Sequence, residues 1–205
     1  MVLQEEELVL KPRVFRIPFS TNVERVALAA GHKGIAIDWV DVDPDDRTPV
    51  EAVSGQTLVP VLVHGDEVVT DSPRILEWLE ERVPEPPLYP REPAQRAAAT
   101  VFVQWFNRVW KVAPNALVGG VDAALSAELR ATVGIFEGLL DGRDYLLGDF
   151  GIADVIAFPF LKYAVFGVQT GDADPFHQIL VENLPLTPGS PLRAWAERVD
   201  AHPRG

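Results

Sequence analysis

The sequence predicts an α/β domain followed by an all-helical domain. Strand-like and helix-like patterns alternate up to about residue 82, and only helical periodicity follows residue 93. Between them, residues 83–93 hold five prolines in eleven positions, which excludes a helix or a central strand there. We therefore expect an N-terminal tail over 1–12, an α/β domain over 13–84, a linker over 85–93 and a helical domain over 94–205.

Each element of the first domain has a local signal. Apolar residues recur at helical spacing over 23–33, and Gly34 lies just past the end of that segment. A strand before this helix and a strand after it predict a crossover with two parallel strands. The expected elements are strands at 13–17 and 35–42, a weaker helix near 48–53, a hairpin with strands at 59–63 and 68–69, and a final helix from Ser72. This order is a thioredoxin-like layout around one small sheet.

The second domain shows helical periodicity over 94–118, 123–140 and 152–166, without convincing strands. Gly151 occupies the expected N-cap position of the third helix, and Asp154 lies in its first turn, where a carboxylate favours the helix dipole. We interpret this pair as a stability feature without chemistry.

Composition excludes several classes of function. The net charge of −12 disfavours nucleic acid and anionic membranes as partners, and no apolar run reaches the roughly 18 residues that a transmembrane helix needs. The acidic start of the chain does not resemble a secretory signal, so we expect a cytoplasmic protein. The absence of cysteine removes disulfides, thiolate metal sites and a protein-thiol nucleophile.

Motifs for other chemistries are missing from the sequence. The four histidines, at positions 32, 64, 177 and 202, show no metal-ligand spacing, so no metal site is expected. There is no Gly-x-Ser-x-Gly elbow, phosphate-binding loop or dinucleotide fingerprint.

Residues 59–77 are the most informative part of the chain. Ser72 followed by Pro73 predicts a helix that begins with a Ser N-cap, and the free N–H groups at a helix start favour an anion. Pro60 lacks a donor, so Val59-Pro60 predicts a turn, either trans or cis, that leaves the Val59 backbone available to a ligand. A peptide-like anion suits both features.

The turn before the first helix contains a candidate hydroxyl donor. Thr21 and Glu24 fit a capping box in which Thr21 is the N-cap, and this leaves the Ser20 hydroxyl uncommitted. Two alternatives remain open here. The segment is an ordinary cap-rich turn, or Thr21 is the donor and Ser20 is the cap.

Taken together, Ser20, Val59-Pro60 and Asp71-Ser72 resemble the motifs of the cytosolic glutathione S-transferases, in their serine-type, bacterial-like form. The resemblance is strong from Arg13 to about Pro90 and returns at 145–161. It implies that Val59 pairs its backbone with the cysteinyl part of glutathione and that Asp71 and Ser72 hold the γ-glutamyl end. It also implies that the Ser20 hydroxyl donates to the thiolate, in a site with no mixed disulfide.

The same resemblance implies a function: transfer of glutathione, as co-substrate, to a small hydrophobic electrophile in detoxification. It implies a homodimer with no metal and no permanently bound cofactor. Phe19 and Thr21 are further candidate contacts to the ligand. Arg47 and Gln56 are candidates for binding the glycyl carboxylate. The candidates for the second-substrate pocket, which is expected between the domains, are Trp105, Arg108 and Trp110. A solvated loop is the alternative for Arg47 and Gln56, and core packing is the alternative for the aromatic residues.

Two other functions remain open. A glutathione-dependent isomerase or dehalogenase would use the same glutathione site with a different substrate pocket. A non-catalytic binding protein would keep the fold without turnover. Thiol transfer of the glutaredoxin type requires a cysteine that this chain lacks.

Overall fold

The computed structural model describes residues 11–205, and the predicted tail lies outside the described residues except for Lys11 and Pro12. The chain divides into two compact units. One contains the residues up to Pro87 together with His202–Gly205, and the other contains Leu88–Ala201. An α/β first unit and a helical second unit confirm the predicted fold class.

The first unit is built on a four-stranded sheet with the order β2-β1-β3-β4. As predicted, β1 and β2 are parallel, whereas β3 is antiparallel to both β1 and β4. The strands are β1 (Arg13–Arg16), β2 (Asp38–Asp41), β3 (Val61–His64) and β4 (Glu67–Thr70). Strand β2 is shorter than the alternation over 35–42 predicted.

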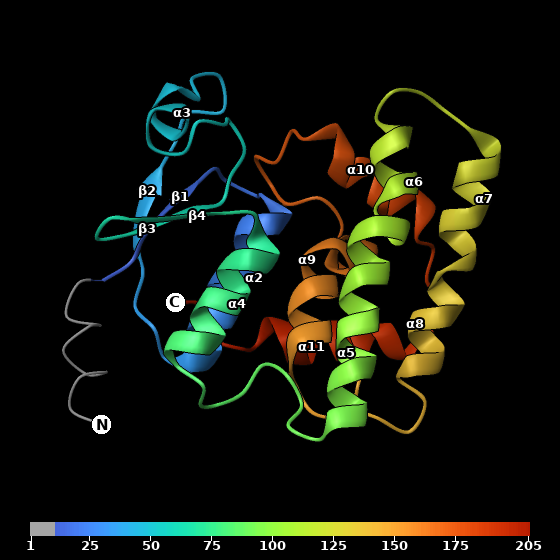
Figure 1. The fold of residues 1–205 in the computed structure, drawn as a ribbon. Helices are drawn as coiled ribbons and strands as arrows, with labels where there is room; N and C mark the ends of the chain where they lie inside the picture. Colours follow the sequence, from blue (N-terminus) through green and yellow to red (C-terminus); the bar gives the residue numbers. More distant parts are fainter. Residues whose placement is uncertain (1–10) are drawn as a thin grey trace. The chain divides into compact units, whose positions relative to one another are not determined.

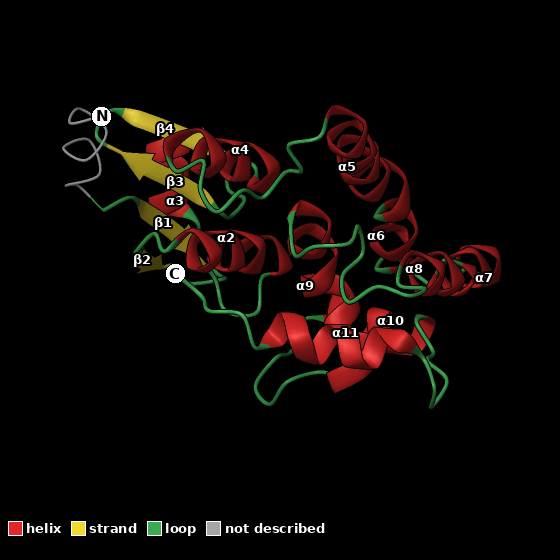
Figure 2. Cartoon of the chain, turned by 90° about the horizontal axis from the view of Figure 1, so that it is seen from below, coloured by secondary structure: helices red, strands yellow, loops and turns green. Residues whose placement is uncertain are grey.

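Both faces of this sheet are covered by helices. Phe15 and Val61 form a buried cluster with Val50 of α3 (Thr48–Ser54), so α3 covers that face. The neighbouring strand residues Val14 and Leu62 are fully buried and point to the opposite face, because side chains alternate along a strand. Helices α2 (Thr21–Lys33) and α4 (Ser72–Arg82) pack side by side there (Figures 1 and 2).

Two predicted helix starts need correction by one residue. Ser20, and not Thr21, is the N-cap of α2, because Thr21 is the first helical residue and its side chain is buried. Similarly, Asp71 takes the N-cap position of α4, and Ser72 is the first residue of that helix. The predicted end of α2 is confirmed: Gly34 follows Lys33 in a left-handed conformation with φ 67°.

The second unit contains helices throughout. The three predicted helical segments are confirmed, although the first is a series of three pieces and the second a series of two, and α10 and α11 were not predicted. The helices are α5 (Pro93–Trp105), the π-helical turn η1 (Phe106–Trp110), α6 (Val112–Leu117), α7 (Ala123–Ala131), α8 (Val133–Leu139), α9 (Ile152–Phe166), α10 (Pro175–Asn183) and α11 (Pro191–Asp200).

Helix α9 is the core of this unit, since every residue from Ile152 to Tyr163 is buried. The Asp154 carboxylate in its first turn accepts hydrogen bonds from the backbone N–H of Leu146 at 3.0 Å, the backbone N–H of Gly151 at 3.1 Å and the indole Nε1 of Trp195 at 2.7 Å. Burial raises the pKa of Asp154 to about 6, and the three N–H donors oppose this rise.

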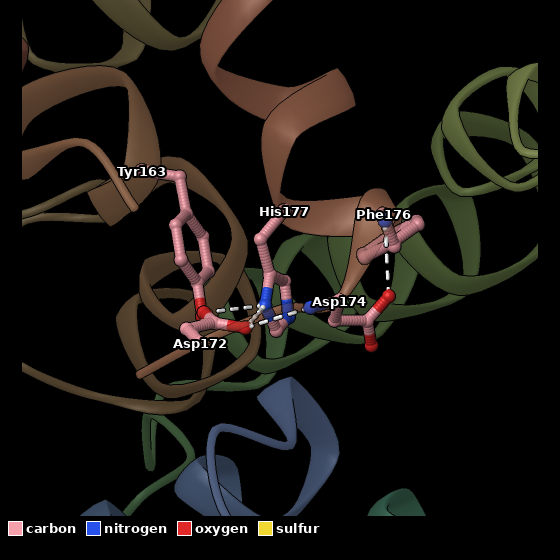
Figure 3. A network of polar contacts seen from close by, with 5 residues as sticks. All are labelled: Tyr163, Asp172, Asp174, Phe176 and His177. Carbon is pink, nitrogen blue, oxygen red and sulfur yellow. Dashed lines mark hydrogen bonds and ion pairs between the residues drawn. The ribbon is translucent and has the colours of Figure 1, made fainter. Parts of the chain in front are cut away.

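A network of hydrogen-bonded side chains connects the C-terminal part of α9 to the start of α10 (Figure 3). The buried carboxylate of Asp172 accepts from the Nδ1 of His177 at 2.7 Å, the hydroxyl of Tyr163 at 3.2 Å and the backbone N–H of Asp174 at 3.1 Å. The rings of Tyr163 and His177 stack with 4.2 Å between their centroids. His177 is thus a hydrogen-bonded core residue.

Among residues 11–205, no helix is both long enough and apolar enough to cross a bilayer.

Candidate functional site

The strand register brings the three predicted site segments to one end of the sheet. Phe15 near the end of β1 pairs with Val61 at the start of β3, and Val61 pairs with Thr70 at the end of β4. The turn that contains Ser20 follows β1, Val59-Pro60 precedes β3, and Asp71-Ser72 follows β4. The three segments therefore leave the sheet at the same end.

Ser20 is both the cap of α2 and a potential donor. Its Oγ accepts a long hydrogen bond from the Val23 N–H at 3.4 Å. That bond uses an oxygen lone pair, so the hydroxyl proton remains able to bind another acceptor. Ser20 is partly exposed whereas Thr21 is buried, and this favours Ser20 over Thr21 as the residue that meets a ligand. Phe19, just before it, is half-buried and has a positive φ of 61°.

The Val59-Pro60 peptide bond is cis, which selects one of the two forms left open by the sequence. Pro60 is buried and Val59 is half-buried. Val59 precedes Val61, the first residue of β3, so its backbone lies at the margin of the strand ladder.

The start of α4 has an unusual backbone. Asp71 has φ 70°, a left-handed conformation that is costly for a residue other than glycine. Its side chain makes no capping hydrogen bond to the helix. Such conformations concentrate at ligand sites, where the surrounding structure maintains them. The helix start therefore combines a strained, exposed acidic residue with first-turn N–H groups that favour an anion.

Two residues that sequence reasoning missed join α2 to α4. The Nη1 of Arg25 donates to the Asn22 Oδ1 at 3.1 Å and to the Ser72 Oγ at 3.3 Å. The Ser72 hydroxyl in turn lies 3.4 Å from the Asn22 Oδ1. These contacts place the first turn of α2, which begins beside Ser20, against the first residue of α4.

Arg25 brings a buried charge to this junction. It is 1% exposed, and burial lowers its pKa to about 9, with the negative charge of Asp71 opposing the shift. The signal in the sequence is its position: Arg25 lies three and four residues before the apolar Leu28 and Ala29, so it shares a helix face with them, and a charge on such a face is rarely buried without a partner.

Arg47 and Gln56 use polar atoms within their own loops. The Nε of Arg47 donates to the Pro44 carbonyl at 2.8 Å. The Gln56 amide bonds both the N–H and the carbonyl of Leu58, which organises the turn before Val59. Their assignment to the glycyl carboxylate remains a prediction.

The three candidates for the second-substrate pocket lie in the other unit. Trp110 is buried, its ring stacks on Phe106 at 4.4 Å, and its Nε1 donates to the Thr132 Oγ1 at 2.9 Å. Trp105 is half-buried and Arg108 is exposed. Trp110 thus has the core contacts that the alternative interpretation expects, and the substrate role of all three remains a prediction.

Within residues 11–205, no group of three or more histidine, aspartate or glutamate side chains has an arrangement that could hold a metal ion.

Comparisons with known proteins identify the family to which the chain is similar. A family model described as glutathione S-transferase, N-terminal domain, matches residues 14–87. Glutathione S-transferase 1 of Dianthus caryophyllus is 30% identical over 174 residues, which cover 77% of this chain and 79% of that protein. FtsZ-localized protein A of Caulobacter vibrioides is 30% identical over 152 residues, which cover 64% of this chain and 67% of that protein.

A crystal structure of a Tau class glutathione S-transferase from mango, Mangifera indica, has the same fold. The TM-score is 0.77 at 17% sequence identity, and the superposition covers 94% of this chain and 90% of that one.

Proposed function

This chain belongs to the glutathione S-transferase family, and from that premise we propose that it conjugates glutathione to a small hydrophobic electrophile. The observation that carries the proposal is the meeting of Ser20, Val59-Pro60 and Asp71-Ser72 at one end of the sheet. In this proposal, the cysteinyl backbone of glutathione pairs with Val59, its γ-glutamyl end lies at the start of α4, and its sulfur lies beside Ser20.

The required chemistry is a thiolate at neutral pH. A free thiol has a pKa of about 8.5, so the site must lower it by one to two units, at about 1.4 kcal/mol per unit. A hydrogen bond from the Ser20 hydroxyl to a charged sulfur contributes about 1.5–3 kcal/mol. The N-terminus of α2 adds about 0.3–1 kcal/mol. These two sources together supply the shift without a metal or a permanently bound cofactor.

The rest of the site positions glutathione. The α-carboxylate of the γ-glutamyl group suits the first-turn N–H groups of α4, and its ammonium suits the exposed carboxylate of Asp71. The Ser72 hydroxyl, which is buried against Asn22, would have to turn from Asn22 to donate to that carboxylate. Arg25 lies directly behind Ser72, so its positive charge favours an anion there. Fixing both ends of the tripeptide would leave the sulfur in one place, which accounts for part of the rate acceleration.

The test uses isothermal titration with glutathione and turnover of 1-chloro-2,4-dinitrobenzene, with wild type and Ser20→Ala compared. We expect Ser20→Ala to lose about 100-fold in kcat, as expected for the loss of one donor to a developing anion, while glutathione binding is retained. Thr21→Val serves as the matched control, because its buried hydroxyl is one residue away. Unchanged turnover in Ser20→Ala would reject the donor role.

A second candidate function is a binding role without turnover. The similarity to FtsZ-localized protein A, a protein named for its location rather than for a reaction, favours keeping this alternative. Glutathione binding without conjugation of any electrophile in a broad panel would support it. A glutathione-dependent isomerase or dehalogenase is distinguished by the same panel, extended to unsaturated acids and alkyl halides.

The premise also leads us to propose a homodimer in the cytoplasm with a role in detoxification. Sedimentation velocity and cell fractionation test the first two parts of this proposal.

A further inference from the structure

Helix α2 is held along two flanks. One flank carries Asn22, Arg25 and Lys33 and contacts α4 and the segment that follows it. The other flank carries Glu24, Ala27 and Gly31, which are spaced three and four residues apart and therefore share one face. Residues 202–205, which follow α11 in the chain but belong to the first unit, lie along this second flank.

The path of residues 202–205 depends on the absence of a side chain at Gly31. A Cβ at Gly31 would lie 2.0 Å from the carbonyl oxygen of Pro203, too close for any other residue without a shift of the backbone. Farther along, the Gly205 N–H donates to the Ala27 carbonyl at 3.0 Å, and the indole Nε1 of Trp39 donates to the Gly205 carbonyl at 2.7 Å. Residues 202–205 are thus hydrogen-bonded both to α2 and to β2.

Arg204 links this segment to the first turn of α2, which begins after Ser20, the proposed thiolate donor. Its Nη2 lies 3.0 Å from the Glu24 Oε1, and both side chains are mostly buried, with 29% and 17% exposed. The backbone N–H of Glu24 donates to the Ser20 carbonyl at 3.0 Å. Arg204 therefore pairs with the residue whose N–H closes the first turn of α2 on Ser20.

We propose that residues 202–205 act as a strap that fixes the first turn of α2, and that Arg204 is a positioning residue for the Ser20 hydroxyl. This proposal rests on the proposed function, because Ser20 is the group whose position matters. The partly buried ion pair and the two hydrogen bonds of Gly205 each stabilise the contacts of this segment with α2 and β2. Loss of these contacts would make local opening of the first turn of α2 more frequent without unfolding the core.

The first experiment measures amide hydrogen exchange in the full chain, so it needs no catalytic activity. Arg204→Ala removes the ion pair with Glu24. Gly31→Ala displaces the strap by direct contact with Pro203, at a position distant from Ser20 in the helix. Arg204→Lys keeps a positive charge at position 204. Arg130→Ala, at an exposed position on α7, is the matched control. We expect exchange at Val23 and Glu24 to accelerate about tenfold in the first two variants and less than about threefold in the other two. Unchanged exchange at both amides in both strap variants would overturn the strap.

The second experiment tests whether the strap acts on the chemistry. At saturating glutathione, the acidic limb of the pH profile of kcat/KM for the electrophile reports the pKa of the enzyme-bound glutathione thiol. We expect this limb to move up by about half a unit to one unit in Arg204→Ala and Gly31→Ala, and to return toward wild type in Arg204→Lys. A limb that stays in place in both strap variants would overturn the positioning role of Arg204, because a purely structural contact would lower stability alone. If the wild type conjugated nothing, the proposed function would fail, and the exchange rates would still decide the strap.

Discussion

Replacing Arg25 by methionine tests whether its buried charge is kept for stability or for the site. Burial lowers the pKa of Arg25 by several units, to about 9, in the folded protein. At about 1.4 kcal/mol per unit, burial disfavours the charged guanidinium by about 5 kcal/mol. Its hydrogen bonds to Asn22 and Ser72, at 3.1 and 3.3 Å, return about 1.5–3 kcal/mol each. These opposing effects nearly cancel.

We therefore expect Arg25→Met to change the free energy of unfolding by less than about 2 kcal/mol, since methionine fills a similar volume without a charge. Glutathione binding should weaken by at least about tenfold, because Ser72 loses the donor that orients it and the anion site loses a cation. Urea denaturation and isothermal titration measure the two quantities. Arg130→Met provides the exposed control.

Two results would contradict these expectations for Arg25→Met. A loss of more than about 3 kcal/mol in the free energy of unfolding would mean that the charge is a net source of stability. Unchanged glutathione affinity would mean that Arg25 supports the packing of α2 on α4 and not the ligand.

Three further predictions concern polar groups that are buried or half-buried, and denaturant unfolding measures each of them. The folded state holds the Asp154 proton more tightly than the unfolded state, because the pKa of Asp154 is raised to about 6. The difference in free energy of unfolding between wild type and Asp154→Asn should therefore shrink by up to about 3 kcal/mol as the pH rises from 4 to above 6. An increase in this difference over the same pH range would contradict the raised pKa. Lys33→Met should cost about 3–5 kcal/mol, because the Glu80 carboxylate and the carbonyls of Val83 and Pro86 all lose the buried Lys33 Nζ as a partner, and Glu80→Leu added to Lys33→Met should restore part of the loss. Burial lowers the pKa of His32 and of His202, so both bind fewer protons when folded, and the stability they contribute should fall as the pH drops below 6.5; His202→Gln should flatten this dependence.

Features with a local cause could be predicted from the sequence. Gly34 ends α2 because a left-handed residue stops a helix, and His64-Gly65-Asp66 marks the hairpin because Gly65 accepts a positive φ. The cis Val59-Pro60 bond was one of two forms that the sequence allowed.

Features that depend on tertiary contacts could not be predicted. Ser20 and Thr21 are both residue types that cap helices, and the burial of Thr21 decides between them. The link from Arg25 to Ser72 spans 47 positions, so no local pattern reveals it. The return of residues 202–205 to α2 depends on the space above Gly31, and a glycine inside a helical pattern is compatible with many explanations.

The proposed function depends on a hydrogen bond from the Ser20 hydroxyl to the thiolate of bound glutathione. Ultraviolet difference titration of the glutathione complex at the thiolate absorption band measures the pKa of the bound sulfur directly. We expect a pKa of about 6.5–7.5 for the bound thiol in wild type and a return toward about 8.5 in Ser20→Ala. A wild-type value near 8.5, or the same lowered value in both proteins, would contradict this expectation.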